Sequence, residues 1–274
     1  MKLKHKTIVL DDGFRVGVSQ VGTGVPLVFL HGLTVSALAY EELLIELAQR
    51  GFAVTALDAV NHGRTDSLPF GHTVEEMTRV TLRALDALGI DKAVFVGHSM
   101  GGGMVTEIAP RYPERVLAAV LLDAAAGKEH HANLKDPLRA TQRLSGAVVD
   151  VFGDTYQAIK LRSATEGLGL AQTLRSSFAG FRFVRAAYAL LKADTEPLLK
   201  AMKALDVQTA VIHGLSDQIV PFAAGKSAAA SSGGALYAVE GFHSWMLADP
   251  ELAAEVIVFA LLGFYPQRYL LGAG

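Results

Sequence analysis

The stretch that decides the fold reads Val94-Phe95-Val96-Gly97-His98-Ser99-Met100-Gly101-Gly102-Gly103. It begins with an apolar, β-prone run, continues with two glycines that flank Ser99 at positions i−2 and i+2, and ends in residues able to start a helix. A serine at the tip of such a sharp strand-to-helix turn sits in strained backbone, and small neighbours let the chain double back. The turn raises the hydroxyl above the sheet, and the helix N-terminus offers N–H groups to a developing negative charge. The pattern therefore predicts a nucleophilic serine.

Strand-like and helix-like runs alternate on both sides of this turn. Besides the turn's own strand, the sequence predicts strands over residues 7–10, 15–21, 26–30, 52–57, 116–122, 209–212 and 235–239. Besides the helix after Ser99, it predicts helices over residues 36–50, 74–88, 226–230 and 250–264. Strands that alternate with helices at this spacing indicate βαβ units and a mostly parallel sheet.

The alternation stops between residues 127 and 205. Helical periodicity is clearest there over residues 138–152, 156–168 and 178–191, and the stretch carries 12 basic against 7 acidic residues. We expect one α/β core domain made of residues 1–126 and 206–274, with residues 127–205 inserted as a helical cap over the carboxyl edge of the sheet. That edge is where open α/β sheets bind ligands. The excess of positive charge is typical of a solvated helix face.

Composition excludes several classes of function. The chain has 25 basic and 27 acidic residues, so it predicts no general attraction to nucleic acid or membranes. The absence of cysteine excludes disulfides, thiolate nucleophiles and Cys-ligated metals. The charged start has no apolar run after it, and Glu255 interrupts the apolar segment 252–265, so we expect neither a secretory signal nor membrane insertion. A soluble cytoplasmic protein is the prediction.

A serine nucleophile needs a base, and the base needs an acid that fixes its tautomer. Asp217 lies in a loop beyond one predicted strand, and His243 lies beyond the last predicted strand. The order Ser99, Asp217, His243 is that of nucleophile, acid and base on α/β sheets with this type of turn. Asp123, which ends the strand 116–122, is the alternative acid. Asp58 also ends a strand but precedes the nucleophile, which favours a structural role.

Together these motifs resemble the α/β-hydrolase fold family over nearly the whole chain. His31-Gly32 resembles its oxyanion loop, and Asn61-His62-Gly63-Arg64-Thr65 resembles its Gly-His-Gly-x-Ser turn, with Asn61 in place of the usual glycine. The resemblance implies an eight-stranded, mostly parallel sheet flanked by helices, with a helical cap after the sixth strand. It also implies an oxyanion hole built from the backbone N–H groups of Leu33 and Met100.

The chemistry implied is two-step acyl transfer through an acyl-enzyme. We expect His31 and Trp245 to contact the substrate, which would be a small molecule of the ester type. No cofactor is expected. No metal is expected either, because the adjacent His130 and His131 point apart and no carboxylate spacing supports a site.

The predicted function is hydrolysis of a small or medium carboxylic ester or a lactone. Serine at position 99 disfavours the dehalogenases and epoxide hydrolases that resemble this fold, because they use aspartate there. Three alternatives stay open: a carbon–carbon bond hydrolase of ring-cleavage diketones, a cofactor-free haloperoxidase or perhydrolase, and a non-catalytic ligand receptor. Those carbon–carbon hydrolases usually carry a tryptophan directly after the catalytic histidine, whereas Ser244 intervenes here. The substrate, the oligomeric state and the role of residues 265–274 are not determined by the sequence.

Overall fold

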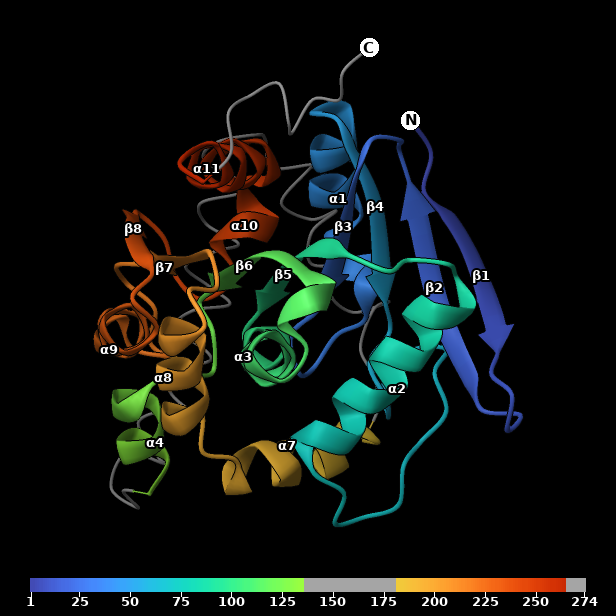
Figure 1. Ribbon diagram of the computed structural model, residues 1–274, viewed down its shortest axis with the longest axis horizontal. Coiled ribbons are helices and arrows are strands. Elements are labelled where there is room, and N and C mark those ends of the chain that lie inside the picture. The colour runs from blue at the N-terminus through green and yellow to red at the C-terminus, as the bar shows by residue number, and fades with distance from the viewer. Residues whose placement is uncertain (136–180, 265–274) are drawn as a thin grey trace.

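One mixed sheet of eight strands organises the chain, in the order β1-β2-β4-β3-β5-β6-β7-β8 (Figure 1). The computed structural model describes residues 1–135 and 181–264. The strands are β1 Lys4–Val9, β2 Arg15–Val21, β3 Val25–Leu30, β4 Phe52–Leu57, β5 Ala93–His98, β6 Val116–Leu122, β7 Thr209–Gly214 and β8 Ala235–Val239. The pairs β1–β2 and β2–β4 are antiparallel, and every other pair is parallel. The predicted eight-stranded, mostly parallel sheet is confirmed.

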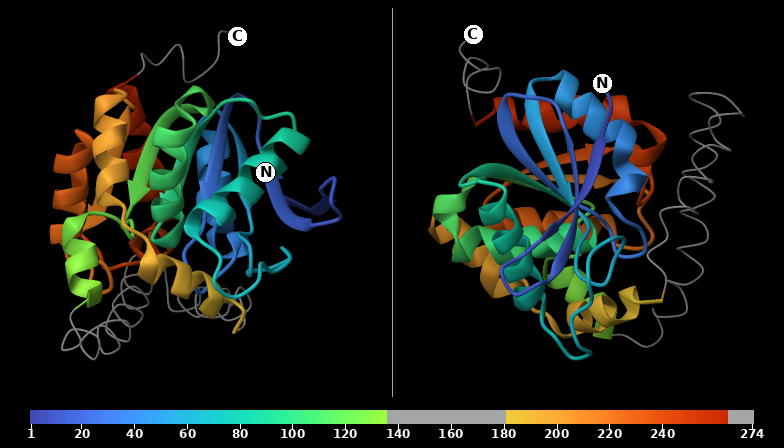
Figure 2. Two further views of the ribbon diagram at one scale, coloured as in Figure 1. Left: turned by 60° about the horizontal axis from the view of Figure 1, so that its bottom comes forward. Right: turned by 90° about the vertical axis from the view of Figure 1, so that its right-hand side faces the viewer.

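Helices cover both faces of the sheet (Figures 1 and 2). They are α1 Glu41–Gln49, α2 Val74–Ala87, α3 Met100–Arg111, α4 Lys128–Lys135, α7 Phe183–Lys192, α8 Glu196–Ala204, α9 Phe222–Ser232, α10 Trp245–Ala248 and α11 Pro250–Leu262. The apolar side chains of α1, α10 and α11 pack into one core layer. Those of α2, α3, α7, α8 and α9 pack into the other. Because both faces are covered, the sheet is buried in the manner of α/β folds.

The strand sequences explain the two layers. Side chains alternate across a strand, so Leu27 and Phe29 of β3 belong to one layer while Val28 and Leu30 belong to the other. All four are 1% exposed or less. Strands that are buried on both faces are mostly apolar, which is why β3, β5 and β6 read as near-continuous apolar runs.

Local signals set the start and end of α2. The Thr73 hydroxyl accepts a hydrogen bond from the Glu76 N–H at 3.1 Å, and the Glu76 carboxylate accepts one from the Thr73 N–H at 2.7 Å. This capping box satisfies N–H groups that have no partner within the helix. Gly89, with a φ of 69°, follows the end of the helix and reverses the chain.

Some element bounds differ from those predicted. The helix predicted over 36–50 begins as a 3-10 turn, η1 Ala37–Tyr40, and becomes α-helical only at Glu41. The segment predicted over 178–191 is α7, which begins at Phe183 and ends at Lys192. The predicted helices over 138–152 and 156–168 lie outside the described residues. None of the described helices has the length and apolar character needed to cross a membrane.

Where the structure describes residues 127–205, they form the helices α4, α7 and α8 and no strand. Residues at the start of α7 contact the loop after β4. The Arg182 guanidinium donates to the carbonyl oxygens of Gly63 at 2.6 Å and Thr65 at 2.9 Å, and Arg185 donates to that of Leu68 at 3.1 Å. The division into a core and a helical cap stays a prediction.

Candidate active site

Ser99 sits at the turn between β5 and α3 in strained backbone. Its φ of 51° and ψ of −115° lie outside the regions that residues with a side chain normally occupy. Such a conformation costs about 1–3 kcal/mol and persists only where its surroundings enforce it. A Cβ on Gly97 would lie 2.3 Å from the Gly101 carbonyl oxygen, and one on Gly101 would lie 2.0 Å from that of Leu30. The two glycines are therefore required by close backbone approach, as the sequence pattern predicts.

The segment after β6 holds the turn in place. The Ser99 N–H donates to the Leu122 carbonyl at 3.0 Å, and the Ser99 carbonyl accepts from the Ala125 N–H at 2.9 Å. Ser99 is 9% exposed. Ser99 is therefore a buried residue whose backbone is hydrogen-bonded on both its N–H and its carbonyl.

Asp217 and His243 form a buried pair beyond the carboxyl ends of β7 and β8. His243 Nδ1 lies 2.8 Å from Asp217 Oδ2, while Oδ1 accepts from the N–H groups of Ile219 and Val220, both at 2.8 Å. With Nδ1–H donated to the carboxylate, Nε2 carries the lone pair that a general base needs. Burial alone would raise the pKa of Asp217, but attraction to His243 and hydrogen bonds from His213 and His243 hold it below its ordinary value. The Asp217 carboxylate therefore stays ionised beside His243.

His98, the residue before Ser99, connects the loop after β3 to the loop that carries His243. The Gly32 N–H donates to Tyr40 Oη at 3.1 Å, Tyr40 Oη lies 2.6 Å from His98 Nδ1, and His98 Nε2 lies 2.9 Å from the His243 carbonyl oxygen. The His98 and His243 rings are 4.8 Å apart between centroids. Burial, and then the neighbouring His243, lower the pKa of His98 to about 3, so its ring is neutral. Tyr40 therefore donates to Nδ1, and Nε2–H donates to the carbonyl.

This chain of hydrogen bonds brings His243 next to the nucleophile turn. His98 belongs to the predicted nucleophile turn, but no pattern in the sequence indicated the contact that Tyr40 makes with it. Tyr40 lies in a helical run whose periodicity carries no sign of a polar contact. Only its place opposite β5 in the folded chain gives its hydroxyl a partner.

The two residues predicted to donate to an oxyanion, Leu33 and Met100, follow β3 and begin α3, and their role in catalysis stays a prediction. Met100 is the first residue of α3, where the helix has no internal acceptor for the N–H group. Leu33 follows β3, and its carbonyl oxygen contacts His62 Nε2. Burial, and then the neighbouring His31, lower the pKa of His62 to about 4. The other ring nitrogen of His62 lies 2.8 Å from the Val60 carbonyl oxygen, so the single N–H of the neutral ring bonds one of the two loop carbonyls.

Asn61, which stands where the family's turn usually has glycine, adopts a left-handed backbone conformation. Its φ is 68°, and asparagine tolerates this left-handed conformation better than most residues with a side chain. The Asn61 N–H donates to the Asp66 carbonyl at 3.1 Å, which closes the loop. The departure from the family pattern therefore stays local.

His31 and Trp245 lie in the interior, each 1% exposed. His31 Nε2 accepts from the Ala59 N–H at 2.9 Å, and its Nδ1 lies 2.8 Å from the Gly32 carbonyl oxygen. The Trp245 indole N–H donates to Asp123 Oδ2 at 2.7 Å, and its rings pack in the core layer of α1 and α11. The predicted substrate contacts of these two residues find no support in this placement, because their polar atoms are already bonded within the protein.

Asp123, the alternative acid, is fully buried and does not replace Asp217 in contact with His243. Within the described part of the chain, Asp123, His213 and Asp217 are the one group of three whose potential ligand atoms lie within 4.8 Å of one another. Asp123 Oδ1 accepts from the Gly214 N–H at 2.7 Å, and His213 Nε2 lies 2.7 Å from the Val220 carbonyl oxygen. A nitrogen that donates a proton to a carbonyl cannot ligate a cation. The group is therefore better described as a hydrogen-bonded network than as a metal site.

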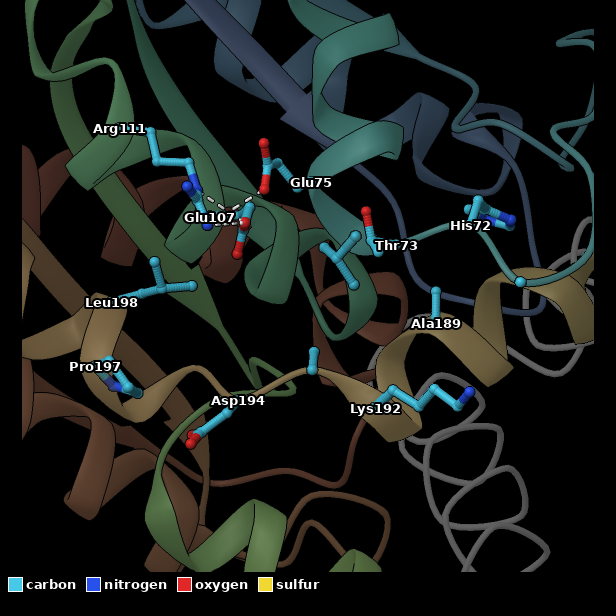
Figure 3. A pocket seen from close by; sticks show the side chains of 13 residues that line it. His72, Thr73, Glu75, Glu107, Arg111, Ala189, Lys192, Asp194, Pro197 and Leu198 are labelled. Carbon is cyan, nitrogen blue, oxygen red and sulfur yellow. Dashed lines mark hydrogen bonds and ion pairs between the residues drawn. The ribbon is translucent and has the colours of Figure 1, made fainter.

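A hollow of about 330 Å³ opens between the start of α2, the end of α3, α7 and α8 (Figure 3). None of Ser99, Asp217 and His243 lines it. Its Arg111 guanidinium is directed to two carboxylates, Glu107 at 2.8 Å and Glu75 at 3.5 Å. These three charges therefore satisfy one another within the wall of the hollow.

Comparison with known proteins agrees with this geometry. Residues 25–246 match the sequence model of the alpha/beta hydrolase fold. The chain belongs to this family. The match spans the nucleophile turn, the Asp217 loop and His243, and the topology described above is that of the family.

Named relatives differ in the reaction that their names state. A protein of Mycobacterium phage D29 named "Putative non-heme haloperoxidase" is 63% identical over 99% of this chain and 100% of its own length. A "Bifunctional esterase/perhydrolase" of Acinetobacter calcoaceticus is 28% identical over 87% of this chain and 91% of its own. The crystal structure of an enol-lactonase from Burkholderia xenovorans LB400 superposes with a TM-score of 0.76 at 20% identity, covering 93% of this chain and 99% of that one.

Proposed function

We propose that this α/β hydrolase cleaves small or medium carboxylic esters or lactones through an acyl-enzyme on Ser99. The observation that carries the proposal is the buried His243–Asp217 pair, bonded at 2.8 Å and joined through His98 to a serine in strained elbow geometry. A serine nucleophile needs a base whose tautomer is fixed by a carboxylate, and the His243–Asp217 pair supplies that combination next to the residue that precedes Ser99.

In the proposed first step His243 Nε2 takes the proton of Ser99 as its oxygen attacks the substrate carbonyl. Asp217 stabilises the imidazolium, and the N–H groups of Leu33 and Met100 stabilise the oxyanion. The imidazolium then protonates the leaving alcohol, and the acyl group stays on Ser99. In the second step His243 activates water, whose attack on the acyl-enzyme releases the acid and restores the serine.

A second candidate is transfer of the same acyl group to hydrogen peroxide. It is favoured by the names of the 63%-identical relative and of the esterase/perhydrolase. Peroxide attacks the acyl-enzyme in place of water and leaves as a peracid. The peracid then oxidises a halide ion with one proton, which yields the hypohalous acid and the carboxylic acid. The two candidates share the first step and all of its residues.

Replacement of Ser99 tests the shared step. Ser99→Ala should abolish the hydrolysis of p-nitrophenyl acetate, while a fluorophosphonate probe should label the wild-type protein at Ser99. Retained turnover in the variant would contradict the serine mechanism. Absence of labelling in the folded wild-type protein would favour the receptor alternative.

Competition between water and peroxide tests the second step. The wild-type protein is incubated with acetate, hydrogen peroxide and bromide, and bromination of phenol red is followed. Bromination that disappears with Ser99→Ala would support acyl transfer to peroxide. Ester hydrolysis without Ser99-dependent bromination would restrict the function to hydrolysis.

A further inference from the structure

The short segment that ends β6 touches the elements of all three proposed catalytic residues. Its Leu122 and Ala125 bond the backbone of Ser99, at 3.0 and 2.9 Å. Between them, the Asp123 N–H donates to the Ile212 carbonyl of β7 at 3.0 Å. This one segment therefore links the backbone of the nucleophile turn directly to the end of β7.

The carboxylate of Asp123 completes this junction. Its Oδ1 accepts from the N–H of Gly214, where the Asp217 loop leaves β7, at 2.7 Å. Its Oδ2 accepts from the indole N–H of Trp245, two residues after His243, at 2.7 Å. The side chain is 0% exposed, and the backbone is held at a φ of 42° that aspartate adopts only rarely. A single buried side chain therefore bridges the acid loop and the histidine loop.

The charge environment of Asp123 differs from that of an ordinary structural carboxylate. Among the described residues no lysine or arginine pairs with it. The titratable groups that face it are His213 from β7, Asp217 from the next loop, His243 from the histidine loop and Tyr40 from η1. Burial raises the pKa of Asp123 to about 7, against the attraction of His213 and with the repulsion of Asp217. A side chain kept at this electrostatic cost needs a role beyond filling space.

We propose that Asp123 is a positioning residue for catalysis, which holds Trp245 and Gly214 so that His243 stays aligned between Asp217 and Ser99. The proposal rests on the serine mechanism proposed above. Asp123 touches neither substrate nor the reacting atoms. It contacts the histidine loop at Trp245, while the His98 ring contacts the same loop at the His243 carbonyl, 2.9 Å away. Two contacts, one to the backbone of His243 and one to the side chain of Trp245, thus fix the loop that carries the base.

The wild-type protein itself offers a first test, because the chain contains a single tryptophan. Its indole N–H gives one nuclear magnetic resonance signal, which should be shifted downfield and protected from exchange by the bond to Asp123. Complete labelling of Ser99 with a fluorophosphonate should move this signal, because the adduct changes the charge on His243. An unmoved signal after complete labelling would overturn the proposal without any variant having to fold.

Substitutions give the second test, with p-nitrophenyl acetate as substrate. Asp123→Asn should lower kcat by up to about 100-fold with little change in KM, since misalignment affects the chemical step more than binding. The matched control is Asp206→Asn, the same change at an exposed aspartate with a φ of 54°, which should leave kcat unchanged. The measured kcat is divided by the fraction of protein that the fluorophosphonate labels, so that a smaller folded fraction in a variant is not mistaken for a lower kcat.

The pH profile separates positioning from mere stability. Because burial raises the pKa of Asp123 to about 7, its carboxyl ionises within the pH range of the ascending limb of kcat/KM, and Asp123→Asn, which has no group that ionises there, should change the position and shape of that limb. Trp245→Phe removes the donor and should lower kcat in the same direction. In the double variant, kcat should fall by less than the product of the two single-variant factors, because both substitutions remove the same hydrogen bond between Asp123 and Trp245. An unmoved limb, or losses that multiply, would overturn the proposal.

Failure of this inference is distinguishable from failure of the proposed function. If Ser99→Ala keeps its activity, the serine mechanism itself is wrong. If Ser99 labels and is essential while kcat per labelled site is the same in Asp123→Asn and Asp206→Asn, the function stands and the positioning role is wrong.

Discussion

The loops after β4 and after β7 each bury an aspartate at the same edge of the sheet, but with different partners. Asp58 accepts from the Ala37 N–H at 3.1 Å and from Arg64, through its N–H at 3.0 Å and its Nε at 3.1 Å. Asp217 likewise accepts backbone N–H groups on one oxygen, but on the other it meets His243 at 2.8 Å. The two carboxylates are equally buried and equally well bonded.

The difference lies in the partner's ability to change its charge. A guanidinium stays protonated at every pH a protein meets, so the Asp58 pair cannot take up or release a proton during a reaction. An imidazole changes its charge near neutrality, so the Asp217 pair can stabilise a proton that arrives transiently. Similar hydrogen bonding thus stabilises the loop after β4 at Asp58, and in the proposed mechanism it prepares Asp217 and His243 for proton transfer.

The largest expected effect comes from neutralising the Asp217 carboxylate. Asp217→Asn should lower kcat for p-nitrophenyl acetate by about 10⁴-fold, because an amide favours the wrong tautomer of His243 and cannot stabilise its cation. The measurement is kcat for each fluorophosphonate-labelled site. Asp58→Asn is the matched control and should change this value by less than about threefold, as expected of a residue that acts only on stability. Similar losses in the two variants would contradict the comparison.

For the free energy of unfolding, the larger effect is expected at Asp58. Asp58→Ala should lower the free energy of unfolding by about 3–5 kcal/mol, because it leaves the Arg64 charge without its buried partner. Urea unfolding followed by circular dichroism measures the change. Arg15→Ala, which breaks an ion pair to Asp66 whose arginine is 65% exposed, should cost about 1 kcal/mol or less. Equal costs would show that the Asp58 pair is not a brace.

Acid should act on the loop after β4 through His62. Its folded pKa of about 4 lies below the unfolded value of about 6.5, so the unfolded chain binds the proton first as pH falls. The stability that neutral His62 contributes is therefore present above pH 6.5 and lost toward pH 4, at about 1.4 kcal/mol per pH unit. Urea unfolding at several pH values should show a shallower loss for His62→Gln. Identical slopes in the two proteins would exclude this contribution.

The smallest effect is expected at the contact between α7 and the same loop. Arg182→Ala removes donors to the Gly63 and Thr65 carbonyls and should lower the free energy of unfolding by about 1 kcal/mol. Arg79→Ala, which breaks an exposed pair with Glu75, should cost only about 0.3–0.5 kcal/mol. Thermal unfolding of both variants compares the two. An Arg182→Ala cost no greater than that of Arg79→Ala would show that this contact does not brace the loop.

Much of the fold could be predicted because its signals are local. The strand sequences are nearly all apolar because helices cover both faces of the sheet. Glycine is required on both sides of Ser99 because a Cβ there would lie only 2.0 or 2.3 Å from a backbone carbonyl oxygen. The order of Ser99, Asp217 and His243 along the chain predicted an acid and a base, and the structure brings Asp217 and His243 into contact at 2.8 Å, while their role with Ser99 stays a prediction. The 3-10 start of the first helix and the short α10 after His243 could not be predicted, because they depend on how loops pack at the sheet edge.

By itself the sequence determined the α/β class, the strained nucleophile turn and the residues able to serve as acid and base. These depend on spacing and side-chain size within a few residues, which the chain carries wherever it folds. Only the tertiary structure decided that Asp217 rather than Asp123 faces His243. It also decided that Tyr40 and His98 tie the histidine loop to the sheet, and that His31 and Trp245 turn inward. Those choices are made between loops more than 25 residues apart, such as Asp217 and His243, and hydrogen-bond partners at that distance are set by the register of the strands that the loops follow.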